Sequence, residues 1–216
     1  MRVLLGRPVL AGSVLALSVL LSCASGQAAS QRHSRHAPIP QATAISVGEQ
    51  TLTPWGWADF CNRNPTECDA NALPAEDLEL TARSWSSIRR VNALVNAMIQ
   101  PLSDMDHWNV LDRWDIPTDG RGDCEDYVLL KRKLLLAEGF PRQALLVTVV
   151  KDENGEGHAI LTVKTDRGDF ILDNMRDEVK AWSQLPYRFV KRQSQTDPNV
   201  WEQIGEPTSA PLIVSR

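Results

Sequence analysis

The stretch with the clearest potential for chemistry is Gly-Arg-Gly-Asp-Cys-Glu-Asp-Tyr at positions 120–127, which is centred on Cys124. Glycines at 120 and 122 allow positive φ and close backbone approach. The apolar run over 127–136 is typical of a helix that enters a core, so Cys124 is predicted to lie at the helix N-terminus. Free backbone N–H groups and the positive end of the helix dipole stabilise a thiolate there. Because the thiolate is the nucleophilic form of cysteine, the position suits covalent catalysis.

Three carboxylates surround this cysteine in the sequence: Asp123, Glu125 and Asp126. Their like charge disfavours a thiolate unless a cation neutralises them. A hard cation that prefers oxygen ligands, such as Ca²⁺, would do so, and the three acids are therefore candidate metal ligands. The alternative is that they only cap the helix, because Asp and Glu are common in a first helical turn.

Two further residues complete a catalytic group with Cys124. His158 opens a predicted strand after a glycine-rich turn, and Asp173 ends the next predicted strand. On adjacent antiparallel strands they can be neighbours, and a hairpin packed across the helix N-terminus brings the imidazole to the sulfur. The group then holds a nucleophile, a base that later protonates the leaving amine, and a carboxylate that fixes the tautomer. Alone, His158 would be interpreted as structural; the combination favours catalysis.

The helices that position these residues follow from hydrophobic periodicity. Apolar residues recur at three- and four-residue intervals over 77–99, which predicts an amphipathic helix that ends before Pro101. A second helix is predicted over 125–138, with Gly139 marking its end. Between the two helices, 104–122 is predicted to be a long acidic, aromatic loop, and loops of this length are often functional.

After the second helix the pattern changes to strands. Strands are predicted over 144–150, 158–163 and 169–173, separated by turn-rich segments. One or two more strands are predicted between 187 and 204. An antiparallel meander packed on a preceding helix predicts the α+β fold class.

Composition bounds the class of protein. The chain has 216 residues and a formal net charge of −4, with 23 basic and 27 acidic residues that are interspersed along it. This length predicts one domain with extensions. We exclude nucleic-acid binding, because the chain offers no basic field for it.

The N-terminus predicts export. Residues 1–26 are expected to be an export signal, with basic residues at the start and an apolar run over 9–21 that is too short to span a bilayer comfortably. Cleavage of this signal would release a soluble periplasmic protein. The alternative is a lipoprotein signal, because Leu-Leu-Ser-Cys at 20–23 resembles a bacterial lipobox and makes Cys23 a candidate lipid anchor.

Residues 27–50 lack apolar periodicity and are predicted to be a flexible linker. The folded domain is predicted over 51–216. Within it, Cys61 and Cys68 can close a small disulfide loop in an oxidising compartment. The alternative is that both are buried and free. Either way, Cys124 has no cysteine partner.

Three motifs in this domain resemble a known family, the bacterial transglutaminase-like cysteine peptidases. They are Gly-Asp-Cys-Glu-Asp-Tyr at 122–127, Gly-His-Ala-Ile-Leu at 157–161 and Leu-Asp-Asn at 172–174. The resemblance runs from about residue 85 to residue 201. It implies a papain-like, transglutaminase-like fold, in which a helix that carries the cysteine packs on an antiparallel sheet that carries histidine and aspartate.

The resemblance also implies roles for individual residues. It makes Cys124 the nucleophile, His158 the general base and acid, and Asp173 the orienting carboxylate. It further implies a calcium site beside the nucleophile. The calcium ligands that it implies are Asp123, Glu125 and Asp126.

The predicted function is an exported, calcium-dependent cysteine endopeptidase that cleaves a protein substrate through a thioester acyl-enzyme. Two alternatives stay open: acyl transfer to an amine, as in transglutaminases, and a catalytically inactive calcium-dependent binding module. The best-understood family member processes a surface adhesin and is held by a membrane-bound regulatory receptor. Nothing in this sequence shows such partners, so the resemblance predicts the fold and the triad better than it predicts the substrate.

Overall fold

The computed structural model describes residues 38–68, 71–205 and Val214. The predicted export signal and the lipidation candidate Cys23 lie outside these residues. Within the described part of the chain, no helix has the length and apolar character needed to cross a membrane.

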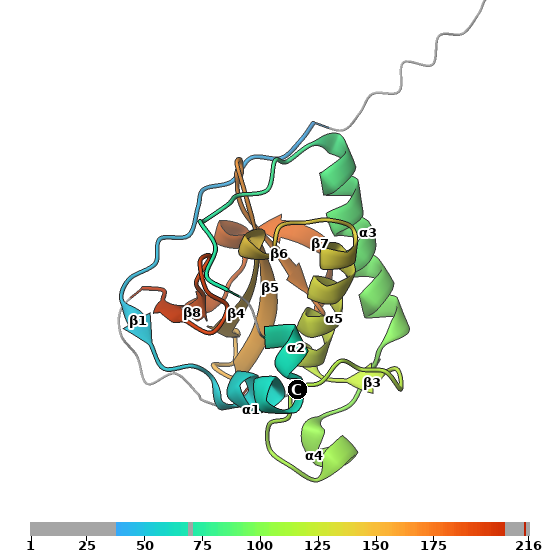
Figure 1. The fold of residues 1–216 in the computed structure, drawn as a ribbon. Coiled ribbons are helices and arrows are strands. Elements are labelled where there is room, and N and C mark those ends of the chain that lie inside the picture. Colours follow the sequence, from blue (N-terminus) through green and yellow to red (C-terminus); the bar gives the residue numbers. More distant parts are fainter. Residues whose placement is uncertain (1–37, 69–70, 206–213, 215–216) are drawn as a thin grey trace, which may run out of the picture. The chain divides into compact units, whose positions relative to one another are not determined.

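A seven-stranded antiparallel sheet forms the centre of the fold (Figure 1), with the strand order β1-β9-β8-β4-β5-β6-β7. Strands β4 to β6 form the predicted meander, β7 extends it by one strand that was not predicted, and β8 returns to pair with the free side of β4. The strands are β1 Gln50–Thr51, β4 Leu145–Lys151, β5 Gly157–Thr165, β6 Gly168–Asp173, β7 Arg176–Ala181, β8 Arg188–Gln193 and β9 Trp201–Gln203.

Five α-helices lie among the described residues: α1 Trp55–Arg63, α2 Pro65–Cys68, α3 Ala82–Met98, α4 Asp104–Trp108 and α5 Cys124–Ala137. Two short 3₁₀ helices, Arg142–Ala144 and Trp182–Gln184, connect strands. A two-stranded parallel pair, β2 Gln100–Pro101 and β3 Arg121–Gly122, closes the base of the segment that contains α4. The fold is therefore α+β, as predicted.

Helix α5 matches the prediction closely, whereas α3 begins later than the predicted residue 77. Helix α3 begins at Ala82, because Thr81 and Ser84 form a capping box that ends the preceding extended segment. Helix α5 begins at Cys124 and stops before Gly139, whose φ of +86° is the left-handed conformation that glycine adopts readily. Cys124 therefore lies at the N-terminus of α5, as the sequence predicts.

Helices α3 and α5 lie side by side on one face of the sheet (Figure 1). Alternate residues of the central strands face them, since successive side chains of a strand point to opposite faces. Leu161 and Val163 of β5 share a core cluster with α5, whereas Ile160 lies in a second cluster on the other face together with Tyr187. The central strands are thus buried on both faces, which fixes their register firmly.

The chain joins the fold earlier than predicted. The sequence predicts a flexible linker to residue 50, but the backbone N–H of Ala42 donates to the Arg167 carbonyl, and that of Gly48 donates to the Gln203 carbonyl. Ile45 is buried in the second cluster. These contacts use backbone groups and one apolar anchor, which leave no periodic pattern in the sequence.

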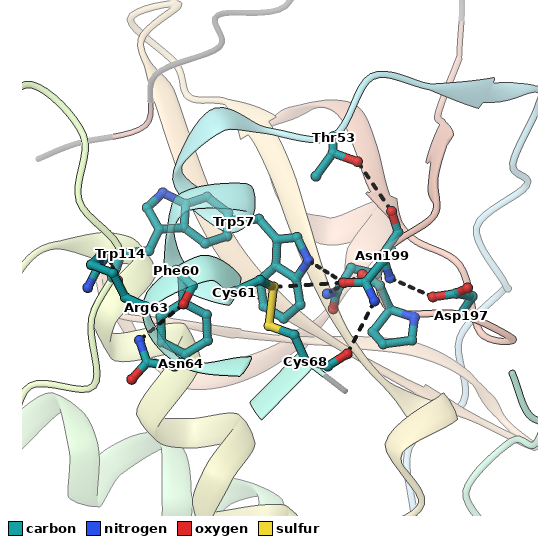
Figure 2. The surroundings of a disulfide bond; sticks show 12 residues. Thr53, Trp57, Phe60, Cys61, Arg63, Asn64, Cys68, Trp114, Asp197 and Asn199 are labelled. Atoms are coloured by element: carbon teal, nitrogen blue, oxygen red, sulfur yellow. Dashed lines mark hydrogen bonds between the residues drawn. A yellow bond between two sulfur atoms is a disulfide. The ribbon is translucent and has the colours of Figure 1, made fainter. Parts of the chain in front are cut away.

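A disulfide joins Cys61 at the end of α1 to Cys68 of α2, as predicted. Figure 2 shows that the side chain of Asn199, from the turn before β9, fills the space beside it. Asn199 accepts a hydrogen bond from Trp57 Nε1 and donates one to the Cys68 carbonyl, both at 3.2 Å. The bridge and Asn199 together hold α1 and α2 against the sheet.

Helix α1 also supports the segment that leads to α5. A Cβ on Gly56 would lie 2.2 Å from the Trp114 ring, so glycine permits this close approach. Arg63 donates to the Trp114 carbonyl and pairs with Asp115 at 2.6 Å. The predicted loop over 104–122 is thus tied to α1, and it contains a short helix, α4, that was not predicted because it has only five residues.

Candidate active site

The Cys124 sulfur lies where α5 meets β5. The backbone N–H of Ala159 in β5 points at Sγ from 3.4 Å, and the thiol donates to Glu125 Oε2 at 3.2 Å. Gly122 has no room for a side chain, because a Cβ there would lie 2.2 Å from Asp126 Oδ2. The requirement at Gly122 is therefore close approach, whereas Gly120 has a positive φ of 79°.

His158 and Asp173 meet on adjacent strands, as predicted. His158 Nε2 lies 2.9 Å from Asp173 Oδ1, and since an ionised carboxylate only accepts, Nε2 carries the proton. The other ring nitrogen, Nδ1, has no oxygen or nitrogen partner among the described residues. The Cys124 sulfur nevertheless lies close enough to affect the titration of the imidazole. The structure thus brings the three predicted residues together.

The surroundings of His158 and Asp173 favour the ionised forms of both side chains. Burial lowers the pKa of His158, but the hydrogen bond to Asp173 and the interaction with Cys124 outweigh it and raise that pKa to about 9. For Asp173 burial acts in the opposite direction, and hydrogen bonds from His158, Tyr187 and the Met175 N–H lower its pKa overall. At neutral pH the pair is therefore imidazolium and carboxylate.

Two asparagines of α3 hold the turn that follows Asp173. Asn96 Nδ2 donates to the Asp173 carbonyl at 3.0 Å, and Asn92 Nδ2 donates to the carbonyls of Arg176 and Asp177 at 2.9 and 3.0 Å. Because the partners are carbonyl oxygens, the amide nitrogens must face them. The two asparagines therefore orient the turn that follows Asp173 and are more than a polar flank of α3.

A cluster of buried carboxylates lies on the other side of Cys124. Ligand oxygens of Asp104, Asp112 and Glu125 lie within 4.8 Å of one another, and those of Asp104, Asp123 and Asp126 do so too. The predicted set is therefore divided: Asp123 and Asp126 lie in one group and Glu125 lies in the other, while Asp104 belongs to both. Asp104 and Asp112 were missed, although the acidic character of the loop over 104–122 signalled that it could contribute.

The backbone around α4 builds this carboxylate cluster. The β2–β3 pair closes the loop and brings α4 to the start of α5, where the Asp104 N–H donates to Asp123 Oδ2 at 3.2 Å. The N–H of Arg113 donates to Asp104, and that of Asp115 donates to Asp126 Oδ1 at 2.7 Å. These neutral donors orient the carboxylates without neutralising them.

Basic side chains among the described residues do not offset the negative charges of this carboxylate cluster. Within the described residues, no Lys or Arg forms an ion pair with Asp104, Asp112, Glu125 or Asp126, and Glu125 Oε1 and Asp112 Oδ2 are buried without a hydrogen-bond partner.

Burial raises the pKa of Asp112 to about 7. It is also the largest cause of the raised pKa values of Glu125 and Asp126, and repulsion from Asp123 adds to both. A set of buried carboxylate oxygens with unsatisfied atoms fits Ca²⁺, which takes six to eight oxygen ligands.

A helix-terminal cysteine packed on an antiparallel sheet that carries histidine and aspartate defines the class of transglutaminase-like cysteine peptidases. The chain belongs to the family of bacterial transglutaminase-like cysteine proteinases (BTLCP), whose sequence profile matches residues 47–209. It is accordingly a cysteine peptidase of the transglutaminase-like type. No curated protein matches the chain.

Solved structures of one bacterial protein are similar to this chain. Legionella pneumophila LapG in its calcium-bound form has a TM-score of 0.49 and 23% identity over 59% of this chain and 74% of that chain. A second LapG structure and an EGTA-treated one each have a TM-score of 0.44 and 24% identity over 50% of this chain, and they are covered over 63% and 62% of their own lengths.

Proposed function

We propose that this protein is an exported, calcium-dependent cysteine endopeptidase with a Cys124–His158–Asp173 triad. One observation carries the proposal: the three side chains meet at the N-terminus of α5, with His158 hydrogen-bonded to Asp173 at 2.9 Å and a backbone N–H directed at the sulfur. The family supports a peptidase, and the geometry supports these residues as its reacting groups.

The chain's own groups account for acylation. In the reacting form His158 already holds the proton of Cys124 as an imidazolium, and the thiolate attacks the carbonyl carbon of the scissile peptide bond. First-turn N–H groups of α5, which have no intrahelical partners, suit the developing oxyanion. The imidazolium then protonates the leaving amine as the C–N bond breaks, which leaves a thioester on Cys124.

Hydrolysis returns the enzyme to its starting state. His158 accepts a proton from water as the water attacks the thioester, and it stays protonated as the C–S bond breaks, which restores the thiolate–imidazolium pair. Asp173 keeps the imidazole in one tautomer through both steps. Neither Cys124 nor His158 has exposed surface, so a substrate reaches the sulfur only after neighbouring residues move.

The calcium ligands would come from two groups of carboxylates that share Asp104: one contains Asp112 and Glu125, and the other contains Asp123 and Asp126. When bound, the ion supplies positive charge that offsets the anions flanking the thiolate. The calcium-bound and EGTA-treated states in which LapG has been solved are in keeping with this proposal.

The location and substrate belong to the proposal as well. The export signal predicted over 1–26 and the disulfide between Cys61 and Cys68 favour the periplasm, because disulfides persist in oxidising compartments. We propose a protein substrate, with a cell-surface adhesin and a membrane-bound regulator as the partners that the family resemblance implies. Attachment through Cys23 is the alternative to a soluble periplasmic form.

The test compares exported proteins after incubation with the wild-type enzyme or with Cys124→Ala, in the presence of Ca²⁺. Sequencing of new N-termini should reveal cleavage products that appear only with the wild-type enzyme, because the variant keeps the fold and loses the nucleophile. Identical N-termini in both samples would refute the peptidase assignment. Incorporation of an added amine into the acyl product in place of water would identify acyl transfer instead.

A further inference from the structure

The Asp173 carboxylate has donors on both of its oxygens. Oδ1 accepts from His158 Nε2 at 2.9 Å and from the Met175 N–H at 3.0 Å. Oδ2 accepts from the Tyr187 hydroxyl at 2.6 Å, a short distance typical of a hydrogen bond to an ionised carboxylate. Among the described residues, Tyr187 is the one hydrogen-bond donor to Oδ2.

The Tyr187 ring is fixed by packing on the face of the sheet opposite α5. It is 8% exposed and belongs to the cluster that contains Ile160 and Ile171, each two residues from His158 or Asp173 on the same strand. The ring also packs edge-on against the imidazole of His158, with 5.7 Å between centroids. Tyr187 therefore contacts both the imidazole and its carboxylate.

Charged groups near Asp173 do not replace this hydroxyl. Arg176 Nε lies 3.9 Å from Asp173 Oδ2, beyond hydrogen-bond distance, and its guanidinium is 5.6 Å from the Tyr187 ring centroid. Lys131 of α5 also interacts electrostatically with Asp173. Burial lowers the pKa of Lys131 to about 7, although the charges of Asp173 and Asp177 act in the opposite direction. Neither cation makes a direct hydrogen bond to the carboxylate.

We propose that Tyr187 is a positioning residue of the peptidase: its hydroxyl anchors Oδ2 so that Oδ1 of Asp173 stays on His158 Nε2. The inference rests on the proposed function for its catalytic consequence. The terminal torsion of aspartate is broad and roughly two-fold, so a carboxylate held at Oδ1 alone can turn away from the imidazole. An anchor on the second oxygen removes that freedom.

The hydroxyl keeps this role across the working pH range. Burial, reinforced by the hydrogen bond to Asp173, raises the pKa of Tyr187 to about 12. The phenol therefore remains a donor throughout the range in which His158 titrates.

The chain offers a matched control, because its only other tyrosine is Tyr127. Tyr127 is also buried, and its hydroxyl donates to the Ile99 carbonyl at 2.8 Å. Tyr127→Phe therefore removes the same kind of buried hydrogen bond as Tyr187→Phe, but it leaves Asp173 untouched. Any loss that stems only from a missing buried hydroxyl appears in both variants.

The experiment uses the full chain with Ca²⁺ and measures the titration of His158 by NMR together with kcat and KM for cleavage. In Tyr187→Phe we expect the pKa of His158 to fall, because a displaced carboxylate stabilises the imidazolium less. We expect kcat to fall about ten- to a hundredfold with KM unchanged. Tyr127→Phe should retain the wild-type titration and a kcat within about twofold.

A wild-type titration and kcat in Tyr187→Phe, or equal losses in both variants, would overturn the positioning role. Failure of the proposed function gives a different result. If the wild-type protein cleaves nothing, the peptidase proposal fails, while the His158 titration still decides whether Tyr187 anchors Asp173.

Discussion

Cys124 lies between two polar regions that differ in how their charges are satisfied. On the β5–β6 side, the single carboxylate of Asp173 receives three hydrogen bonds and faces an imidazolium. On the α4–α5 side, five carboxylates crowd together, and the oxygens Glu125 Oε1 and Asp112 Oδ2 have no partner among the described residues. Both regions are buried, so solvent does not explain the difference.

The pKa shifts of the two regions have opposite signs. The pKa of Asp173 is lowered because its partners outweigh burial, whereas burial and mutual repulsion raise the pKa values of Asp112, Glu125 and Asp126. Burying carboxylates without opposite charge is costly. The protein itself thus supplies the partners of the histidine region, whereas the proposed function requires a cation to complete the acidic region. Each prediction below disturbs one of the two regions or the elements that support it.

The largest effect is expected from Asp104→Asn, which alters a ligand that touches neither Cys124 nor His158. Loss of a ligand should lower cleavage by at least about a hundredfold at limiting Ca²⁺, with recovery at high Ca²⁺. The pKa of His158, followed by NMR, should stay near 9. The control is Asp106→Asn, which alters an exposed acid on the same helix and should retain activity. Equal activity of Asp104→Asn and wild type at limiting Ca²⁺ would remove Asp104 from the site.

Alkaline pH should disable the histidine region while calcium stays bound. With the pKa of His158 raised to about 9, cleavage at saturating Ca²⁺ should fall as the pH rises above that value.

The free energy of unfolding should also decrease as the pH rises. A raised folded-state pKa gives stabilisation that is complete below the unfolded value near 6.5 and is lost as pH rises through about 9. The free energy of unfolding of wild type and His158→Ala, measured in urea between pH 6 and pH 10, should therefore converge; a constant difference would contradict the shift.

A smaller effect is expected from substitution of the two asparagines of α3 that hold the turn after Asp173. Asn96→Ala removes donors to the Asp173 carbonyl and to the turn after it, and it should lower the free energy of unfolding by about 1–3 kcal/mol and kcat by about tenfold. Asn92→Ala removes the same kind of amide from the same helix at a more buried position, and Asn92 does not contact Asp173. It should lower stability at least as much as Asn96→Ala does, and kcat less. Equal kcat values in the two variants would show that the contact with the Asp173 carbonyl has no catalytic consequence.

The smallest effect is expected from the disulfide. Reduction, or the double change Cys61→Ala and Cys68→Ala, opens a short loop and should cost about 2–3 kcal/mol of unfolding free energy. Because α1 reaches the acidic region through Trp114 and Arg63, calcium binding should weaken. The His158 titration should not move. A shift in that titration would show that α1 supports the histidine region as well.

Local sequence signals were enough to predict the histidine region. A glycine-flanked cysteine before an apolar run predicts a helix N-terminus, and a histidine and an aspartate on consecutive strands predict a meeting across a hairpin. Both follow from short-range periodicity. The structure agrees with these elements to within one or two residues at α5, β4, β5 and β6.

The acidic region could be predicted only in part, since Asp104 and Asp112 reach the cluster through long-range contacts. Pairing of β2 with β3 and packing of Trp114 against Gly56 bring Asp104 and Asp112 to the cluster. Tyr187 was missed for a similar reason, because it comes from a loop after β7. Strand β7, Arg-Asp-Glu-Val-Lys-Ala at 176–181, was not predicted since its charged residues mask the alternation typical of strands.

Calcium titration by calorimetry tests the contrast between the two regions most directly. The full chain is titrated with Ca²⁺ at pH 6 and pH 8, in buffers of different ionisation enthalpy. Because the pKa values of Asp104, Asp112, Glu125 and Asp126 are raised, we expect binding to release protons and to be tighter at pH 8. It should also raise the melting temperature, more for Ca²⁺ than for Mg²⁺. An absence of binding heat with no change in melting temperature would contradict the account and leave the five carboxylates as a buried cluster without a cation.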